Sequence, residues 1–199
     1  MKTKVILIAL ALLASLPAAF SQISIPSDGS DGAFNPSANV QIDLSQAVQG
    51  VWSANNSANA GKGIYDPDKW AIVFKFTSVN IPAGVTVTFK NHLSHAPVVW
   101  LVQGSATISG TVNLDGRGYV TTNINPEPGP GGFRGGVPGY VGLGIGAGLA
   151  VPTNGSYALS YGNPMIVPLI GGSGASGGGN GVWGGGVAIL IAASKTINI

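Results

Sequence analysis

Short apolar segments separated by polar turns recur along the chain, and this pattern predicts β-strands. Residues 85–90 read VTVTFK, so valine and phenylalanine fall on one face and threonine and lysine on the other, as in a half-buried strand. Similar segments predict further strands at 40–44, 70–76, 98–102 and 106–114. Gly110 interrupts the apolar series of the last segment, where a bend or a neighbouring backbone can approach. No stretch after the first 21 residues has a helical period, which predicts an all-β protein.

Two of these segments resemble each other. Residues 98–108 and 187–197 are identical at five of eleven positions, at a constant offset of 89. The same strand, bend and strand would recur in this way if the chain passed one face of the molecule repeatedly. The pattern therefore predicts a right-handed parallel β-helix, a solenoid with coils of about 20 residues stacked around an apolar column.

Glycine is concentrated in one region of the 199-residue chain. Of its 32 glycines, 22 lie between Pro128 and Gly186, where they cannot build a conventional core. We expect this region to be an excursion from the solenoid, either closely packed backbone or a loose flap, with an alternating strand at 141–149. The predicted organisation is a signal peptide at 1–21, an N-terminal arm and cap at 22–63, first coils at 64–127, the glycine-rich flap at 128–186 and the start of a further coil at 187–199.

The first residues predict export. Lys2 and Lys4 precede an apolar run of 12 residues, and Ala19 and Ser21 supply the small side chains that a signal peptidase reads, so we expect cleavage after Ser21. A membrane span needs about 20 apolar residues, and none is expected. The remaining chain carries seven basic and seven acidic residues, which argues against binding to nucleic acid. It has no cysteine, so disulfides and thiolate zinc sites are excluded.

Several motifs resemble the opening of large exported glycine-rich proteins of bacteria, at residues 64–75, 81–92, 96–102, 108–116, 130–136 and 168–174. The resemblance implies a right-handed parallel β-helix of the pectate-lyase-like superfold in proteins that are largely uncharacterised and adhesin-like. It also suggests that the chain, which ends in the predicted strand around Ile197, is a fragment of a longer protein. Such motifs encode architecture, and a shared superfold does not fix an activity.

Candidate chemistry is sparse. His92 and His95 have a spacing that suits a metal, but they lie in a predicted turn without nearby carboxylates, so a structural role is favoured. Asp115 follows a strand and precedes Gly116, and we interpret it as a turn residue, like Asp66 and Asp68. Glycoside hydrolysis needs two carboxyl groups roughly 5 to 9.5 Å apart, and no such pair is evident. We therefore expect no catalytic, cofactor-binding or metal-binding residues, and no cofactor.

Aromatic side chains could stack on sugars, but Trp70 and Trp100 lie within apolar strands and are expected in the core. The better candidates for exposure are Tyr119, Tyr140, Tyr157 and Trp183. The glycines at 142–146 lack both the spacing and the following helix of a nucleotide site. The sequence predicts a secreted or cell-surface structural, adhesin-like protein whose partners are extracellular polysaccharide or cell-surface matrix. The alternative is a module that binds or cleaves polysaccharide.

Overall fold

The computed structural model describes residues 24–116, 127–135, 142–144, 169–174 and 188–199 of the chain. The predicted signal peptide lies outside these residues. So do most of the predicted strand at 141–149 and the aromatic candidates Tyr119, Tyr140, Tyr157 and Trp183.

The described residues are mostly strands, joined by turns and by two short 3₁₀ helices, η1 (Leu44–Gln46) and η2 (Ser57–Asn59). The strands are β1 (Gly32–Phe34), β2 (Val40–Asp43), β3 (Val48–Gln49), β4 (Ile64–Asp66), β5 (Ala71–Ile81), β6 (Thr86–Lys90), β7 (Val98–Val102), β8 (Ala106–Ile108), β9 (Thr111–Val112), β10 (Ile189–Ala193) and β11 (Ile197–Asn198). No helix in this part of the chain is long and apolar enough to cross a membrane.

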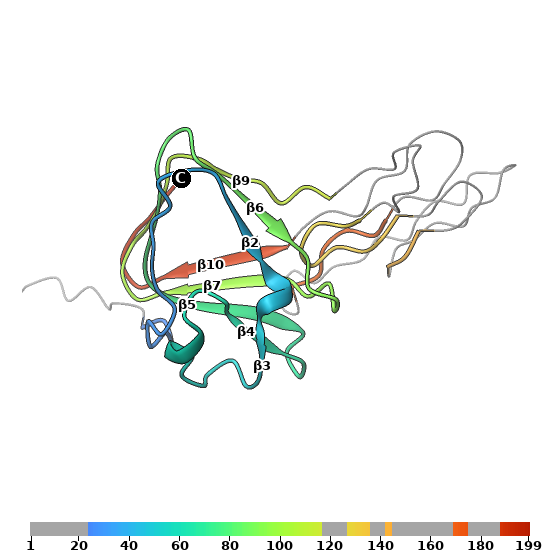
Figure 1. Cartoon of the computed structure of the whole chain (residues 1–199), viewed down its shortest axis with the longest axis horizontal. Coiled ribbons are helices and arrows are strands. Elements are labelled where there is room, and N and C mark those ends of the chain that lie inside the picture. The colour runs from blue at the N-terminus through green and yellow to red at the C-terminus, as the bar shows by residue number, and fades with distance from the viewer. Residues whose placement is uncertain (1–23, 117–126, 136–141, 145–168, 175–187) are drawn as a thin grey trace, which may run out of the picture.

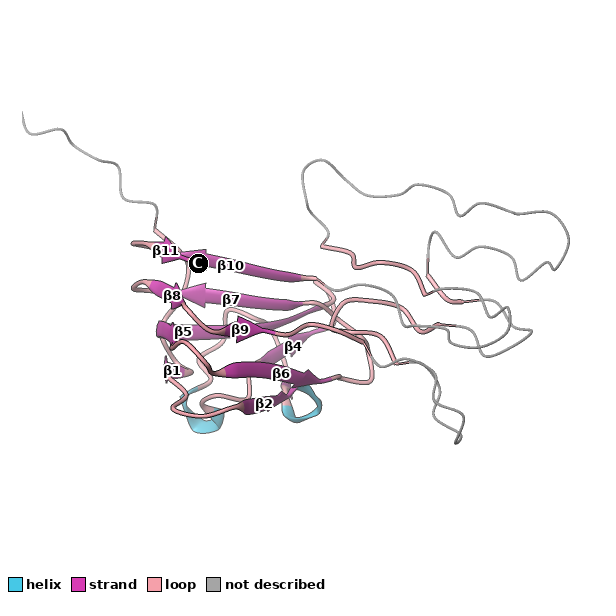
Figure 2. Cartoon of the chain, turned by 90° about the horizontal axis from the view of Figure 1, so that it is seen from above, coloured by secondary structure: helices cyan, strands magenta, loops and turns pink. Residues whose placement is uncertain are grey.

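Two sheets make up the fold. Sheet A has eight strands, with the main order β10-β7-β5-β4-β3, and sheet B has three, in the order β2-β6-β9. The long strand β5 organises sheet A, because its first half pairs with β7 and its second half with β8. Figure 1 shows β2, β6 and β9 crossing above β10, β7 and β5, and Figure 2 shows β10 and β11 together at one edge.

The expected right-handed parallel β-helix is wrong. Sheet A is mixed, because β4 runs antiparallel to β5 with Ile64 opposite Val73, whereas a parallel solenoid would stack its strands in one direction. The physical reason lies in the connection. Only four residues join Asp66 to Ala71, which suffices for an antiparallel reversal, while a parallel crossover needs a dozen or more. The described fold is a mixed sheet and a parallel sheet around a shared core.

The two similar segments do lie side by side. β10 pairs with β7 and β11 pairs with β8, both in parallel. Val98 is opposite Ile189 and Ala106 is opposite Ile197, an offset of 91 rather than the 89 of the sequence comparison. The predicted register is therefore wrong by two residues. Because side chains alternate between the two faces of a strand with a period of two, this error leaves each side chain on the face that was predicted for it.

The main core lies between the sheets. Phe74 and Trp100 from sheet A pack with Ile42 and Val87 from sheet B and with Val85, which directly precedes β6, and all five are buried. Val85 and Val87 are therefore inward as predicted, and Phe89, the third residue of this series, is half-buried against the same core. Apart from Lys75, the segments 71–76 and 98–102 are apolar on both faces, because a second cluster around Val73 and Leu101 packs on the other face of sheet A against Ile25 and Trp52.

A buried polar cluster fastens the N-terminal segment to β5. The Asp31 carboxylate accepts hydrogen bonds from the backbone N–H groups of Lys75 (2.7 Å) and Gly61 (2.9 Å) and from Nδ2 of Asn56 (3.3 Å). The Lys75 side chain is 1% exposed, and its Nζ donates to Asp28 Oδ2 at 3.0 Å and to the carbonyl oxygen of Ala54. These bonds satisfy charged groups that would otherwise be costly to bury.

Glycine permits close backbone approach at several bends. The predicted strand 106–114 is broken at Gly110, where an added Cβ would overlap the carbonyl oxygens of Pro82 and Val85. In the glycine-rich region, Gly131 has a φ of 74° and lies against Pro97 and Ala188. The described parts of this region are hydrogen-bonded to one another, for example Gly171 N to Gly131 O at 2.9 Å. At these described positions the backbone packs closely, while the choice between close contact and a loose flap for 141–149 falls mostly outside the described residues.

Candidate functional site: a polar cavity beside the parallel sheet

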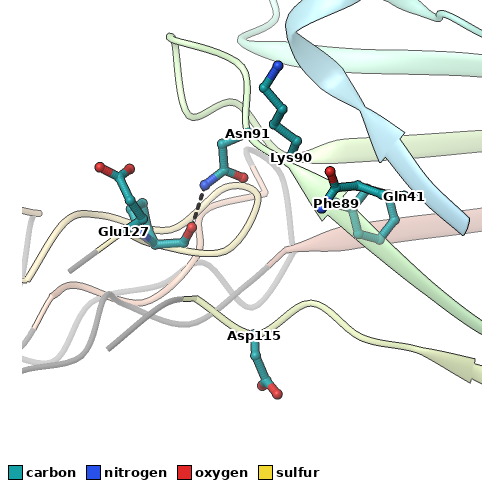
Figure 3. A pocket seen from close by; sticks show the side chains of 7 residues that line it. Gln41, Phe89, Lys90, Asn91, Asp115 and Glu127 are labelled. Atoms are coloured by element: carbon teal, nitrogen blue, oxygen red, sulfur yellow. Dashed lines mark hydrogen bonds between the residues drawn. The ribbon is translucent and has the colours of Figure 1, made fainter. Parts of the chain in front are cut away.

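A cavity of about 290 Å³ lies where sheet B meets the start of the glycine-rich region. Three segments of sheet B and one returning segment line it, through the residues Gln41, Phe89, Lys90, Asn91, Asp115, Glu127 and Pro128. Figure 3 shows Glu127 and Asn91 on one side, Gln41 and Phe89 on the other, and Asp115 below them. It is the candidate site because it combines charged, amide and aromatic side chains.

The parallel pairing of sheet B brings these residues together. Val40 to Asp43 of β2 lie beside Val87 to Lys90 of β6, which places Gln41 next to Thr88. β9 continues the sheet on the other side of β6 and leads the chain toward Asp115. Because parallel strands end at the same edge, the polar residues that follow them gather there.

One wall of the cavity is held by an ion pair. Asp43 and Lys90 are directly opposite each other, and Lys90 Nζ lies 2.8 Å from Asp43 Oδ2. Ser45 donates its backbone N–H to Asp43 Oδ1 at 3.0 Å, and its hydroxyl also bonds that oxygen. The Lys90 ammonium, followed by these serine bonds, lowers the pKa of Asp43 from 3.8 to about 2. Asp43 is therefore ionised across the physiological range.

The opposite wall is held by a second set of bonds. Arg134 Nη2 lies 2.8 Å from Glu127 Oε1. The Asn91 side-chain amide donates to the carbonyl oxygen of Pro128, which ties the end of β6 to the returning segment (Figure 3). The cations of both walls are thus already paired with carboxylates of the same molecule.

Two polar side chains line the cavity without a described partner. The Gln41 amide and the Asp115 carboxylate make no hydrogen bond or ion pair to the part of the chain that the structure describes. Phe89 also lines the cavity, but its ring packs on the core, 6.3 Å from that of Trp100, on the face of sheet B opposite to Gln41. An amide offers donors and an acceptor, and a carboxylate offers acceptors.

The interpretation of Asp115 as a turn residue stays a prediction, because the backbone two residues further on, which its side chain would bond, lies outside the described residues. The turn bond at this point comes from Asn113, whose Oδ1 accepts from the backbone N–H of Asp115 at 2.8 Å. The Asp115 side chain is exposed and lines the cavity. Asp66, in contrast, is buried and accepts from the backbone N–H groups of Asp68 and Lys69, so its turn role is confirmed.

The two histidines lie in the turn between β6 and β7. His92 Nδ1 bonds the hydroxyl of Ser94 at 2.7 Å and accepts from the Ser94 backbone N–H at 3.1 Å. Burial, and secondarily the proximity of His95, lowers the pKa of His92. In the described ranges, no three histidine or acidic side chains are grouped as a metal would require.

The tryptophans expected in the core differ from each other. Trp100 is fully buried, as predicted. Trp70 is half-buried, has a φ of 46°, and donates its indole N–H to the carbonyl oxygen of Ser94 at 3.0 Å. Its ring is stacked on Phe133, with centroids 6.0 Å apart. Trp70 therefore joins the strand core to the glycine-rich region.

Comparison with known proteins does not assign the chain to a family. No family model, curated protein or solved structure matches it. The resemblance to exported glycine-rich proteins stays a prediction, and the case for function depends on the geometry described above.

Sequence reasoning did not single out most residues of the cavity. Gln41 and Lys90 occupy outward positions of alternating strands, where polar side chains are ordinary. Glu127 is far from Asn91 in the sequence, so no local pattern predicts that the two residues line one cavity. Asp115 was the one lining residue with a signal, because it directly follows a strand.

Proposed function

We propose that this protein is an exported structural, adhesin-like protein of the cell surface, whose role is to present a rigid β-sheet scaffold. One observation carries the proposal. The buried or half-buried charged groups of the described residues are committed to internal bonds, as in the Asp31 cluster and the Asp43–Lys90 and Glu127–Arg134 pairs. Charged side chains that are engaged in internal ion pairs and hydrogen bonds stabilise the fold, and such groups are not positioned to act as catalytic acids or bases.

The arrangement of the cavity favours this role over cleavage of polysaccharide. Glu127 and Asp115 are the two carboxylates that line it, and Figure 3 shows them pointing in different directions. Glu127 is also engaged in an internal ion pair, with its Oε1 2.8 Å from Arg134 Nη2. Retaining and inverting hydrolysis both need two carboxyl groups that face one bond.

Export and surface location can be tested together. The chain would be expressed with its native leader in a bacterial host, and the mature N-terminus would be determined by mass spectrometry. We expect a product that begins at Gln22, is recovered at the cell surface or in the medium, and is digested by protease added to intact cells.

The matched control is a variant with Leu10→Arg and Leu12→Arg, which interrupts the apolar run of the leader. This variant should keep its leader and stay inside the cell. Retention of the unaltered chain in the cytoplasm with its leader intact would overturn the proposal.

A further inference from the structure

The chain has two histidines, His92 and His95, and both lie in the turn at residues 91–95 between β6 and β7. Imidazole is the side chain whose ordinary pKa lies closest to neutral pH. Mild acid therefore acts on the side chains of this protein mainly at this one turn.

The turn connects the strand core to the start of the glycine-rich region. Trp70 donates its indole N–H to the carbonyl oxygen of Ser94 at 3.0 Å, and its ring stacks on Phe133 with centroids 6.0 Å apart. The Asn91 side chain donates to the carbonyl oxygen of Pro128. We propose that this turn is an acid-sensitive clamp, which loosens its hold on the glycine-rich region when His92 is protonated.

The Nδ1 atom of His92 acts as a hydrogen-bond acceptor within the turn. It accepts from the backbone N–H of Ser94 at 3.1 Å, and it bonds the Ser94 hydroxyl at 2.7 Å. A proton added to Nδ1 turns this acceptor into a donor. The hydroxyl can rotate and accept instead, but the backbone N–H cannot, so its bond is lost. Protonation of His92 therefore removes a bond that holds Ser94, whose carbonyl oxygen in turn holds Trp70.

The surroundings of His92 do not compensate a positive charge. Tyr65 of β4 stacks on its ring, with centroids 4.4 Å apart, and His95 lies in the same turn. The charged side chains of the neighbouring segments are already paired with one another, Lys90 with Asp43 and Arg134 with Glu127. Burial lowers the pKa of His92, and the proximity of His95 lowers it further. The clamp is therefore closed at neutral pH and opens only in acid.

Backbone strain gives the protonated turn a way to open. His95 has a φ of 53° and Trp70 a φ of 46°. Bulky side chains rarely adopt this left-handed region, and they stay there only where surrounding contacts hold them. The loss of one supporting bond therefore favours relaxation of the backbone, which releases the Trp70 indole from Ser94.

Nuclear magnetic resonance of the purified chain tests the clamp. The histidine Cε1–H signals and the Trp70 indole N–H would be followed from about pH 7.5 to about pH 5, with Trp70→Phe to identify the indole signal. We expect His92 to titrate below pH 6.5 and the indole N–H to shift with the same midpoint. After correction for the intrinsic effect of pH, the indole N–H should exchange about fivefold faster in acid, the effect of one hydrogen bond. The amides of Gly132 and Phe133 should follow it, while those of β7 should not.

Two variants assign the response to one histidine. His92→Asn keeps an acceptor but does not titrate, so it should abolish the response. His95→Asn is the matched control, because asparagine tolerates a positive φ. It should keep the response and move its midpoint to higher pH, since His95 lowers the pKa of His92.

The inference is overturned if the Trp70 indole does not respond to acid or if its midpoint differs from that of His92. Both results come from the unaltered chain, so they decide the question even where a variant does not fold. A response that persists in His92→Asn, or that is lost in a folded His95→Asn, would also overturn it. The inference goes beyond the proposed function, and because the test uses purified protein, its outcome is independent of export.

Discussion

Replacing Asp31 with alanine tests whether the N-terminal segment is part of the folded scaffold. The Asp31 carboxylate is 6% exposed and receives two short backbone hydrogen bonds, from Lys75 at 2.7 Å and Gly61 at 2.9 Å, and a longer one from Asn56 at 3.3 Å. Each hydrogen bond to a charged group contributes about 1.5–3 kcal/mol. Because the two short bonds dominate, we expect Asp31→Ala to lower the free energy of unfolding by about 3–5 kcal/mol.

Urea denaturation followed by tryptophan fluorescence and circular dichroism measures this loss. With a slope of about 2 kcal/mol per molar urea, the midpoint should move down by about 2 M. Asp31→Asn keeps one oxygen acceptor but loses the charge, so its midpoint should fall between those of the unaltered chain and the alanine variant.

Asp68→Ala is the matched control, because its side chain is exposed, and the change should stay within about 0.5 kcal/mol. If Asp31→Ala unfolds within about 1 kcal/mol of the unaltered chain, the cluster does not stabilise the fold and the reasoning from buried bonds is refuted.

Three further predictions concern a bend and two titrating groups. Gly110→Ala should lower the free energy of unfolding by about 1–3 kcal/mol, because its Cβ would overlap two carbonyl oxygens; a melting temperature equal to that of the unaltered chain would contradict the close approach. The pKa of Asp43 is lowered from 3.8 to about 2, so its pair with Lys90 stabilises the fold above pH 4, and that contribution is lost as the pH falls toward 2. Both partners are partly exposed, so the contribution is at most about 1 kcal/mol, and Lys90→Met should flatten this part of the stability profile. The pKa of His92 is lowered from 6.5, so the unfolded chain takes up a proton before the folded chain does, and stability should fall as the pH drops below 6.5; His92→Asn, which keeps an acceptor for the turn, should remove this dependence.

Alternation and apolar runs predicted β2, β6, β7, the first half of β5 and the segment that forms β8 and β9, but they did not predict β1, β3 or β4. The inward positions Val85 and Val87 are buried, and the run at 98–102 is buried on both faces as strand β7. These patterns are local, because one buried face imposes a period of two on the residues that form it. The close approach at Gly110 was also foreseeable, since a glycine in an inward series leaves room for backbone.

The arrangement of the strands was not foreseeable in the same way. The turn at residues 66–68 is visible in the sequence, but the antiparallel return that it produces between β4 and β5 is a property of the pairing. The internal similarity indicated which segments are neighbours, yet it misplaced their register by two residues, because a shift of two leaves the inward and outward positions unchanged. The burial of Asp31 is equally non-local, since its donors are 25 to 44 positions away.

The cavity shows why a cluster of polar side chains can escape a sequence that reveals its strands. Gln41 and Lys90 are outward residues on strands that are 47 positions apart, and the strand pattern accounts for each of them without a ligand. They become parts of one site because β2 and β6 pair in parallel and because Glu127 and Pro128 return to the end of β6. The ion pairs Lys90–Asp43 and Arg134–Glu127 then hold the gathered segments to one another, so side chains that look ordinary in the sequence act together as part of the scaffold.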